Sequence, residues 1–187
     1  MAKVNIQGRL SYPALFKASA FEGQEPKYSA HILVAADSPA LAKLRAAMQE
    51  AAEAKWGAKA PAMLKGLIAN GKVCVRDGST KAGCDGYEGN WFVSAASRKR
   101  PLVIDRDKSP LTEADGKPYA GCIVNAVIEI WAQDNNFGKR LNAELKGVQF
   151  VKDGPAFGGS APASADDFDD LSDLGDGASD DDFEDLL

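Results

Sequence analysis

No lysine or arginine follows Lys152, although the chain continues to Leu187. Residues 154–187 hold eleven acidic side chains, whereas residues 1–153 hold all 22 basic and 16 acidic ones. The body therefore carries a net charge of +6 and the C-terminal segment −11, a split that the overall charge of −5 conceals. A basic body of this kind suits a polyanionic partner such as nucleic acid.

Other features are missing as well. The chain has no run of about 18 apolar residues, which predicts that no segment crosses a membrane. Residues 1–5 lack the apolar stretch of a secretory signal. The three cysteines, Cys74, Cys84 and Cys122, form no CxxC pair, which favours reduced thiols over a disulfide framework. We therefore expect a cytoplasmic protein (the host cytoplasm, if a phage encodes it).

Sequence patterns of catalysis are weak. Residues 78–81, GSTK, have the wrong order and spacing for a phosphate-binding P-loop. The single histidine, His31, has no cysteine or serine motif near it, and its spacing to the cysteines fits no zinc pattern. The sequence predicts no enzyme, cofactor or metal. One alternative stays open: Asp105 and Asp107 could hold Mg²⁺ in a nuclease, or form a charged turn after a strand.

Hydrophobic periodicity predicts a mainly β body with one helical insertion. Alternation predicts strands, and a helix is expected from Pro39, after the capping residues Asp37 and Ser38, to about residue 56. A second, shorter helix is expected over 61–68. This order fits a small antiparallel barrel better than a doubly wound sheet. The strands are expected over residues 4–10, 28–35, 72–76, 91–97, 102–104, 119–131 and 145–151.

The C-terminal part differs in composition from the body. Residues 158–165 are small-residue linker sequence, and acidic clusters follow. Such a segment can bury too little apolar surface to offset its ordering entropy, which predicts disorder in the free protein. The sequence therefore divides into a domain over 1–154 and a flexible acidic tail over 155–187.

Single-strand binding needs a cationic surface and exposed aromatic rings. The glycine-rich middle of the body and its flanking strands offer both, although a buried tryptophan beside a solvated basic turn would give the same pattern. Alternation along the strand over 119–131 puts Trp131 on the face opposite the core, where it could stack on a base or cap the barrel. Tyr12 is a further stacking candidate. The expected DNA-binding residues are Lys72, Arg76, Lys81, Tyr87, Trp91, Arg98, Lys99, Arg100, Trp131, Phe137, Lys139 and Arg140.

The end of the tail combines charge with apolar anchors. A solubilising role explains its aspartates but not Phe168, Phe183 and the last two leucines, whereas segments that fold on binding need such anchors. The expected partner-binding peptide is Asp180, Asp181, Asp182, Phe183, Glu184, Asp185, Leu186 and Leu187.

Four short segments carry a resemblance that spans residues 4–154. They are GRLSYP at 8–13, DGYEGNW at 85–91, RPLVID at 100–105 and LKGVQFVKDG at 145–154. In these, the chain resembles a family of phage-encoded single-stranded DNA-binding proteins with an OB-fold. The resemblance implies a five-stranded Greek-key barrel with a helical insertion, and binding that tolerates any base.

The tail separately resembles those of bacterial and phage single-strand binders, which recruit replication and repair proteins through an acidic-aromatic end. It departs from them because Leu186 and Leu187 follow Phe183. The sequence thus predicts a protein that coats single-stranded DNA in phage replication or recombination and recruits partners through its tail. Homo-oligomerisation stays open, and so does a second function, an acidic DNA mimic or inhibitor in which the tail is the active part.

Overall fold

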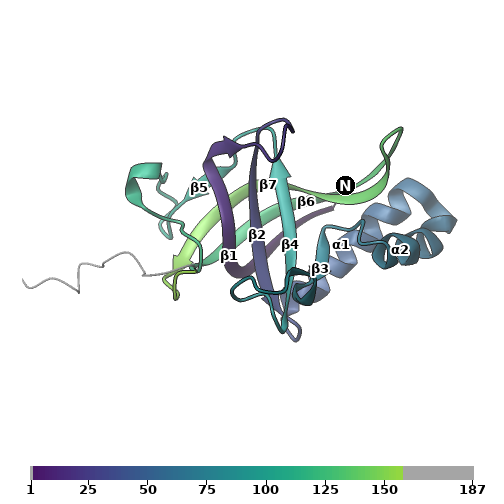
Figure 1. Ribbon diagram of the computed structural model, residues 1–187, viewed down its shortest axis with the longest axis horizontal. Coiled ribbons are helices and arrows are strands. Elements are labelled where there is room, and N and C mark those ends of the chain that lie inside the picture. Colours follow the sequence, from purple (N-terminus) through teal and green to yellow (C-terminus); the bar gives the residue numbers. More distant parts are fainter. Residues whose placement is uncertain (1, 158–187) are drawn as a thin grey trace, which may run out of the picture.

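The computed structural model describes residues 2–157. The predicted disorder of the tail therefore lies outside the described residues from residue 158 onwards. Seven strands and two α-helices make up the described part, with short 3₁₀ turns between them (Figure 1). The elements are β1 (Ala2–Ser19), β2 (Lys27–Ala35), α1 (Pro39–Trp56), α2 (Ala60–Ala69), β3 (Val75–Asp77), β4 (Asn90–Ser97), β5 (Leu102–Ile104), β6 (Ile123–Asn135) and β7 (Gly138–Lys152).

Five of the strands close into a barrel. β1 pairs antiparallel with β2 and with β6, β2 pairs with β4, and β6 pairs with β7. A parallel bridge from Ala96 of β4 to Glu144 of β7 closes the barrel. A parallel contact between the third and fifth strands of an otherwise antiparallel five-stranded barrel is the OB-fold arrangement, so the predicted fold class is confirmed.

The long first strand can pair on both sides because it bends. The register between β1 and β2 shifts between Ser11 and Ala14, and Tyr12 there has a φ of 45°. Such a bulge bends the strand and re-aims a side chain. The Tyr12 ring is accordingly 58% exposed while Leu10 and Leu15 on either side are buried.

Alternation along β6 separates core from surface as the sequence predicts. Its inward face holds Val124, Ala126, Ile128 and Ile130, none of which is exposed. They pack with the inward faces of the other barrel strands into one core. The outward face of β6, which includes Trp131, is half-buried, so this strand can support a binding surface on one side.

The helices are inserted between β2 and β3. Ser38 caps α1 by accepting a hydrogen bond from the Ala40 amide at 3.2 Å, with Pro39 following as the first helical residue. The buried face of α1 packs against the barrel core. At its end, Trp56 Nε1 donates to Asp134 Oδ2 of β6 at 2.8 Å. The helix pair is thereby fixed to the far end of the β6–β7 hairpin, which projects on the same side of the barrel (Figure 1).

Four strand predictions were wrong in their limits. β1 runs from Ala2 to Ser19 rather than over 4–10, because the bulge at Tyr12 lets the strand bend and continue its pairing with β2. β6 begins at Ile123 because residues 119–122 form a turn in which the Cys122 amide bonds the Tyr119 carbonyl. β7 begins at Gly138 because the β6–β7 ladder continues to the Asn135–Gly138 pair. β3 is shorter than expected, since the carbonyl of Lys72 accepts from the Leu141 amide of β7 instead. The longer hairpin matters most, because it forms one wall of the site.

Candidate nucleic-acid interface

A groove of about 1180 Å³ crosses the barrel between β4 and the β6–β7 hairpin. Ser94 and Ala96 of β4, residues 71–74 and Arg76 line one side, and outward residues of the hairpin line the other. Gln24 and Lys27, at the turn between β1 and β2, lie at its margin. The groove is thus bounded by the β1–β2 and β6–β7 connections, which in OB-folds flank the face that binds oligonucleotides.

Six basic side chains line this groove, and five of them are among the residues predicted from the sequence. Arg98 also forms an exposed ion pair with Glu25 at 2.8 Å, which a phosphate could replace at small cost. Among the described residues Glu144 is the one acidic side chain in the lining, and Lys146 pairs with it at 2.9 Å. The lining therefore carries an excess of positive charge from Lys27, Lys72, Arg76, Arg98, Lys99 and Arg140.

Trp131 lies on the outward face of β6 and lines the groove. It pairs across the hairpin with Asn142, whose Nδ2 donates to Gln133 Oε1 at 2.9 Å. Arg140 pairs with Gln133 two residues further along the ladder and so lies on the same face. A half-buried indole thus sits among amides and beside a guanidinium, which provides a stacking ring with a phosphate ligand next to it.

Phe137 is at the tip of the same hairpin and is 91% exposed. Its amide donates to Asn135 Oδ1 at 3.0 Å, which fixes the turn that presents the ring. An apolar ring so exposed contributes nothing to the core, and it also lines the groove.

A second group of rings continues from the groove over the outer face of the barrel. His31 of β2 pairs with Ser94 of the groove, and its ring lies 5.8 Å from that of Tyr12 in an edge-on arrangement. His31 Nδ1 is 2.7 Å from the hydroxyl of Tyr87. Burial, with the nearby charges of Lys81 and Arg76, lowers the pKa of His31 to about 4. The ring is therefore neutral near pH 7.

Two predicted stacking residues lie elsewhere. Tyr87 does not line the groove, because its side chain has no exposure and packs with Leu33 and Phe92 in a second small core. Its contact with DNA stays a prediction that this burial does not favour. Trp91 packs against the main barrel core, and the Arg45 guanidinium of α1 lies over its ring at 5.1 Å. The alternative of a buried tryptophan therefore describes Trp91 better than stacking does.

Three predicted basic residues also lie outside the groove lining. Lys139 is on the opposite face of β7 from Arg140 and pairs with Asp134 at 3.8 Å. The Arg100 guanidinium lies 5.6 Å above the ring of Phe16. Lys81 ends a 3₁₀ turn near His31. Their predicted role in DNA binding stays a prediction.

The sequence analysis overlooked Lys27, Ser94, Gln133 and Asn142 as lining residues. Leu141, Ala143 and Leu145 alternate along the sequence and are all buried. This alternation could have predicted a last strand that begins at Gly138, with the polar residues between them on its outward face. Lys27 and Ser94 had no local signal, because only the closed barrel brings them together.

The nuclease alternative finds no support in the described residues. Asp105 pairs with Lys117 at 2.9 Å, and Asp107 accepts from the Ser109 hydroxyl at 2.5 Å and from the Ser109 amide at 2.9 Å. These contacts lower the pKa of both carboxyls. Residues 2–157 contain no group of three or more histidine, cysteine, aspartate or glutamate side chains that could hold a metal ion. Within the same part of the chain, no helix is long and apolar enough to cross a membrane.

Comparison with known proteins decides the family. The family model described as Enterobacter phage Enc34, ssDNA-binding protein, matches residues 2–184. The chain belongs to this family. The Enc34 family is one of DNA-binding proteins rather than enzymes. Protein p50 of Acyrthosiphon pisum secondary endosymbiont phage 1 is 44% identical over 168 residues, covering 88% of this chain and 90% of that protein.

Solved structures give the same result. The bacteriophage Enc34 single-stranded DNA-binding protein in complex with ssDNA is 30% identical, with a TM-score of 0.69, over 84% of this chain and 90% of that one. The single-stranded DNA-binding protein gp2.5 of bacteriophage T7 shares the fold, with a TM-score of 0.55 at 12% identity over 90% of this chain and 97% of that one. The resemblance seen in the sequence is thus confirmed across the body.

Proposed function

We propose that this chain coats single-stranded DNA during phage replication or recombination, with little sequence preference, by holding it in the groove between β4 and the β6–β7 hairpin. The observation that carries the proposal is the gathering of six basic side chains and Trp131 in one groove. A relative of 30% identity was solved in complex with ssDNA, which supports the same ligand here.

Each part of the groove suits one part of a nucleotide. The basic side chains would neutralise phosphates and release condensed counterions. Trp131 would stack on a base, and since every base has a π-face, this contact does not select a sequence. The Gln133 and Asn142 side-chain amides are already hydrogen-bonded to each other. Because part of their hydrogen-bonding capacity is used in this way, we expect them to position the DNA rather than to read the identity of a base.

The bound DNA strand would leave the groove across Ser94, towards His31 and Tyr12. Ser94 and His31 are register partners, and Tyr12 is next to His31 on the adjacent strand. A neutral His31 ring adds aromatic surface rather than charge. This path uses the exposed Tyr12 ring as a second stacking site, in keeping with the open faces that other single-strand binders provide.

Titration with oligonucleotides tests DNA binding directly. Quenching of tryptophan fluorescence by oligo-dT and oligo-dC should give similar affinities, with weaker binding to a duplex of equal length. Absence of binding at low salt would refute the proposal and favour the acidic DNA-mimic alternative. Loss of full-length labelled ssDNA in the presence of Mg²⁺ would instead favour the nuclease alternative.

The second half of the proposal concerns recruitment by Asp180–Leu187, which lies outside the described residues. Its apolar residues among carboxylates favour a peptide ligand for basic clefts. Phe183→Ala keeps every charge, so it should reduce co-purification of phage replication proteins, whereas the control Ser179→Ala should not. Equal recovery with both variants would refute recruitment while leaving DNA binding untouched.

A further inference from the structure

A cavity of about 340 Å³ opens on the barrel at the point where the described chain ends. It shares no described lining residue with the groove between β4 and the β6–β7 hairpin (the DNA groove). Three of its lining residues lie against Phe157. The Arg9 guanidinium lies over the ring, Leu33 belongs to the small core on which the ring packs, and a Cβ on Gly86 would collide with it. The chain therefore reaches residue 158 at the edge of this cavity, which we call the exit cavity.

The exit cavity combines positive charge with apolar side chains. Arg9 and Lys152 are the two charged residues in its described lining, and both are basic. Arg9 donates to two backbone carbonyls, and neither Arg9 nor Lys152 forms an ion pair within residues 2–157. Three aliphatic side chains also line the cavity: Leu33, Val34 and Ile123. Two such cations beside aliphatic groups favour an acidic ligand that also carries apolar side chains.

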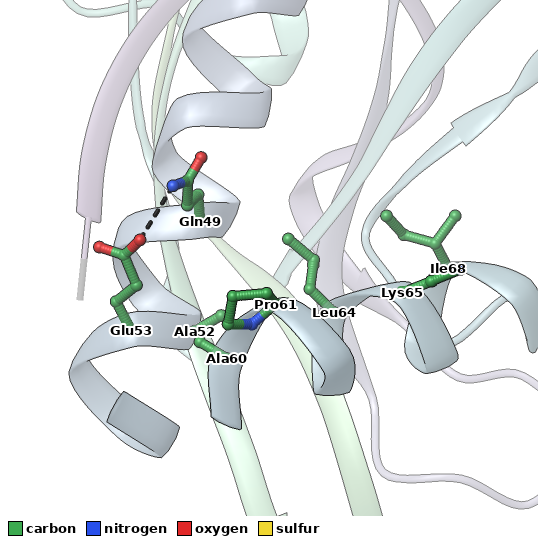
Figure 2. A pocket seen from close by; sticks show the side chains of 8 residues that line it. All are labelled: Gln49, Ala52, Glu53, Ala60, Pro61, Leu64, Lys65 and Ile68. Atoms are coloured by element: carbon green, nitrogen blue, oxygen red, sulfur yellow. Dashed lines mark hydrogen bonds between the residues drawn. The ribbon is translucent and has the colours of Figure 1, made fainter. Parts of the chain in front are cut away.

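The start of α1 adds to this preference. Ser38, the capping residue of α1, lines the exit cavity, and the first turn of that helix holds no acidic residue. The amino end of a helix carries a partial positive charge, which stabilises a nearby carboxylate. By comparison, the charged residues that line the cavity between α1 and α2 are one glutamate and one lysine, Glu53 and Lys65 (Figure 2). Of these two cavities, the exit cavity is therefore the one that suits an acidic peptide.

The acidic tail contains one hexapeptide pattern twice. Residues 166–171 read DDFDDL and residues 181–186 read DDFEDL, so the two copies differ only in having Asp169 in one and Glu184 in the other. Each copy has four carboxylates around a phenylalanine, with a leucine three residues after the ring. Either copy thus offers the negative charge and the apolar groups that the exit cavity favours, and the two differ in how far they lie from it along the chain.

We infer that the first copy, residues 166–171, binds in the exit cavity of its own chain. Eight residues separate it from Phe157, whereas 23 residues separate the second copy. A flexible linker of eight residues has a root-mean-square end-to-end distance of about 16 Å, which suits a cavity that begins at Phe157. Because effective concentration falls roughly as the −3/2 power of linker length, the first copy has an advantage of about fivefold. Its binding leaves the second copy, which lies within the proposed recruitment peptide, for partner proteins.

Photocrosslinking in the full-length protein tests this inference. p-Benzoylphenylalanine replaces Phe168, and the same replacement of Phe183, which has the same place in the second copy, is the matched control. The Phe168 position should crosslink within one chain about fivefold more than the Phe183 position. Lys152→Glu should lower the yield from Phe168 by about threefold, whereas Lys59→Glu, the same charge change at an exposed lysine outside the exit cavity, should not. The crosslinked peptides should contain Leu33, Val34 or Ile123.

Several results would overturn the inference. They are no crosslink from Phe168 to these peptides, crosslinks only between chains or only to the helix pair, equal yields from Phe168 and Phe183, or equal losses in the two lysine variants. Oligo-dT should leave the Phe168 crosslink in place, and its loss on adding oligo-dT would instead place the first copy in the DNA groove. Affinity for the oligonucleotide is titrated in the same samples. Absence of DNA binding would refute the proposed function alone, since the crosslink is first measured without DNA.

Discussion

The guanidinium of Arg9 lies 3.8 Å above the centre of the Phe157 ring. The same side chain donates from Nε to the Gly121 carbonyl at 3.0 Å and from Nη2 to the Pro155 carbonyl. Phe157 packs against the small core of Leu33, Tyr87 and Phe92. The sequence analysis assigned residues 155–157 to the tail, but here they pack on the barrel.

This contact predicts where a shortened chain stays stable. A chain ending at Gly154 lacks the ring on Arg9 and exposes the small core, so its free energy of unfolding should fall by about 1–3 kcal/mol relative to a chain ending at Phe157. Denaturant unfolding of the two proteins measures the difference. Equal midpoints would mean that Phe157 contributes nothing to the fold.

The glycine at position 86 gives a related prediction. A Cβ on Gly86 would lie 2.6 Å from Cζ of Phe157, and the residue has a φ of 78°. Gly86→Ala should therefore displace Phe157 and strain the loop, lowering the free energy of unfolding by about 1–3 kcal/mol. Gly89 has a similar φ of 76°, and an added Cβ there would meet nothing within 4 Å. Gly89→Ala therefore measures the loss of stability that comes from backbone strain alone. If both variants lose the same stability, the ring contact is not the cause.

Trp131 and Trp91 should differ in their response to DNA. Trp131→Ala should weaken ssDNA binding by about 1–3 kcal/mol and remove much of the fluorescence quenching by poly-dT. Trp91→Phe should leave both unchanged, since the ring packs on the core below Arg45. Titrations of the two single variants with the same oligonucleotide measure the contrast. Quenching that survives loss of Trp131 but not of Trp91 would reverse the assignment.

His31 should make stability depend on pH. Its pKa falls from 6.5 to about 4 in the folded protein, so the unfolded chain binds an extra proton between these values. The stabilisation is present above about pH 6.5 and is lost as the pH falls towards 4, by on the order of 1–2 kcal/mol between pH 7 and 5. Denaturant midpoints at these two pH values check it. His31→Gln should show a smaller change, and an equal change would exclude His31 as the cause.

Sequence patterns located the barrel strands, both helices and most of the groove's charge because those features are local. Alternation along β6 placed Trp131 outward, and the basic residues at 72, 76, 98, 99 and 140 meet in one groove. The burial of Tyr87 was not predictable in the same way. It depends on Leu33 and Phe92 from separate strands, and a glycine-rich loop carries no pattern that reveals such long-range contacts.

The salt dependence of ssDNA affinity in two neighbouring charge variants tests the central claim most directly. Arg140 lines the groove, whereas Lys139 is on the other face of β7 and pairs with Asp134. Each neutralised phosphate contributes about −0.7 to the slope of log K against log salt. Arg140→Gln should therefore make the slope shallower by about 0.7 and weaken binding, while Lys139→Gln should leave the slope of the parent. Equal slopes in the two variants would contradict the assignment of this groove as the DNA-binding surface.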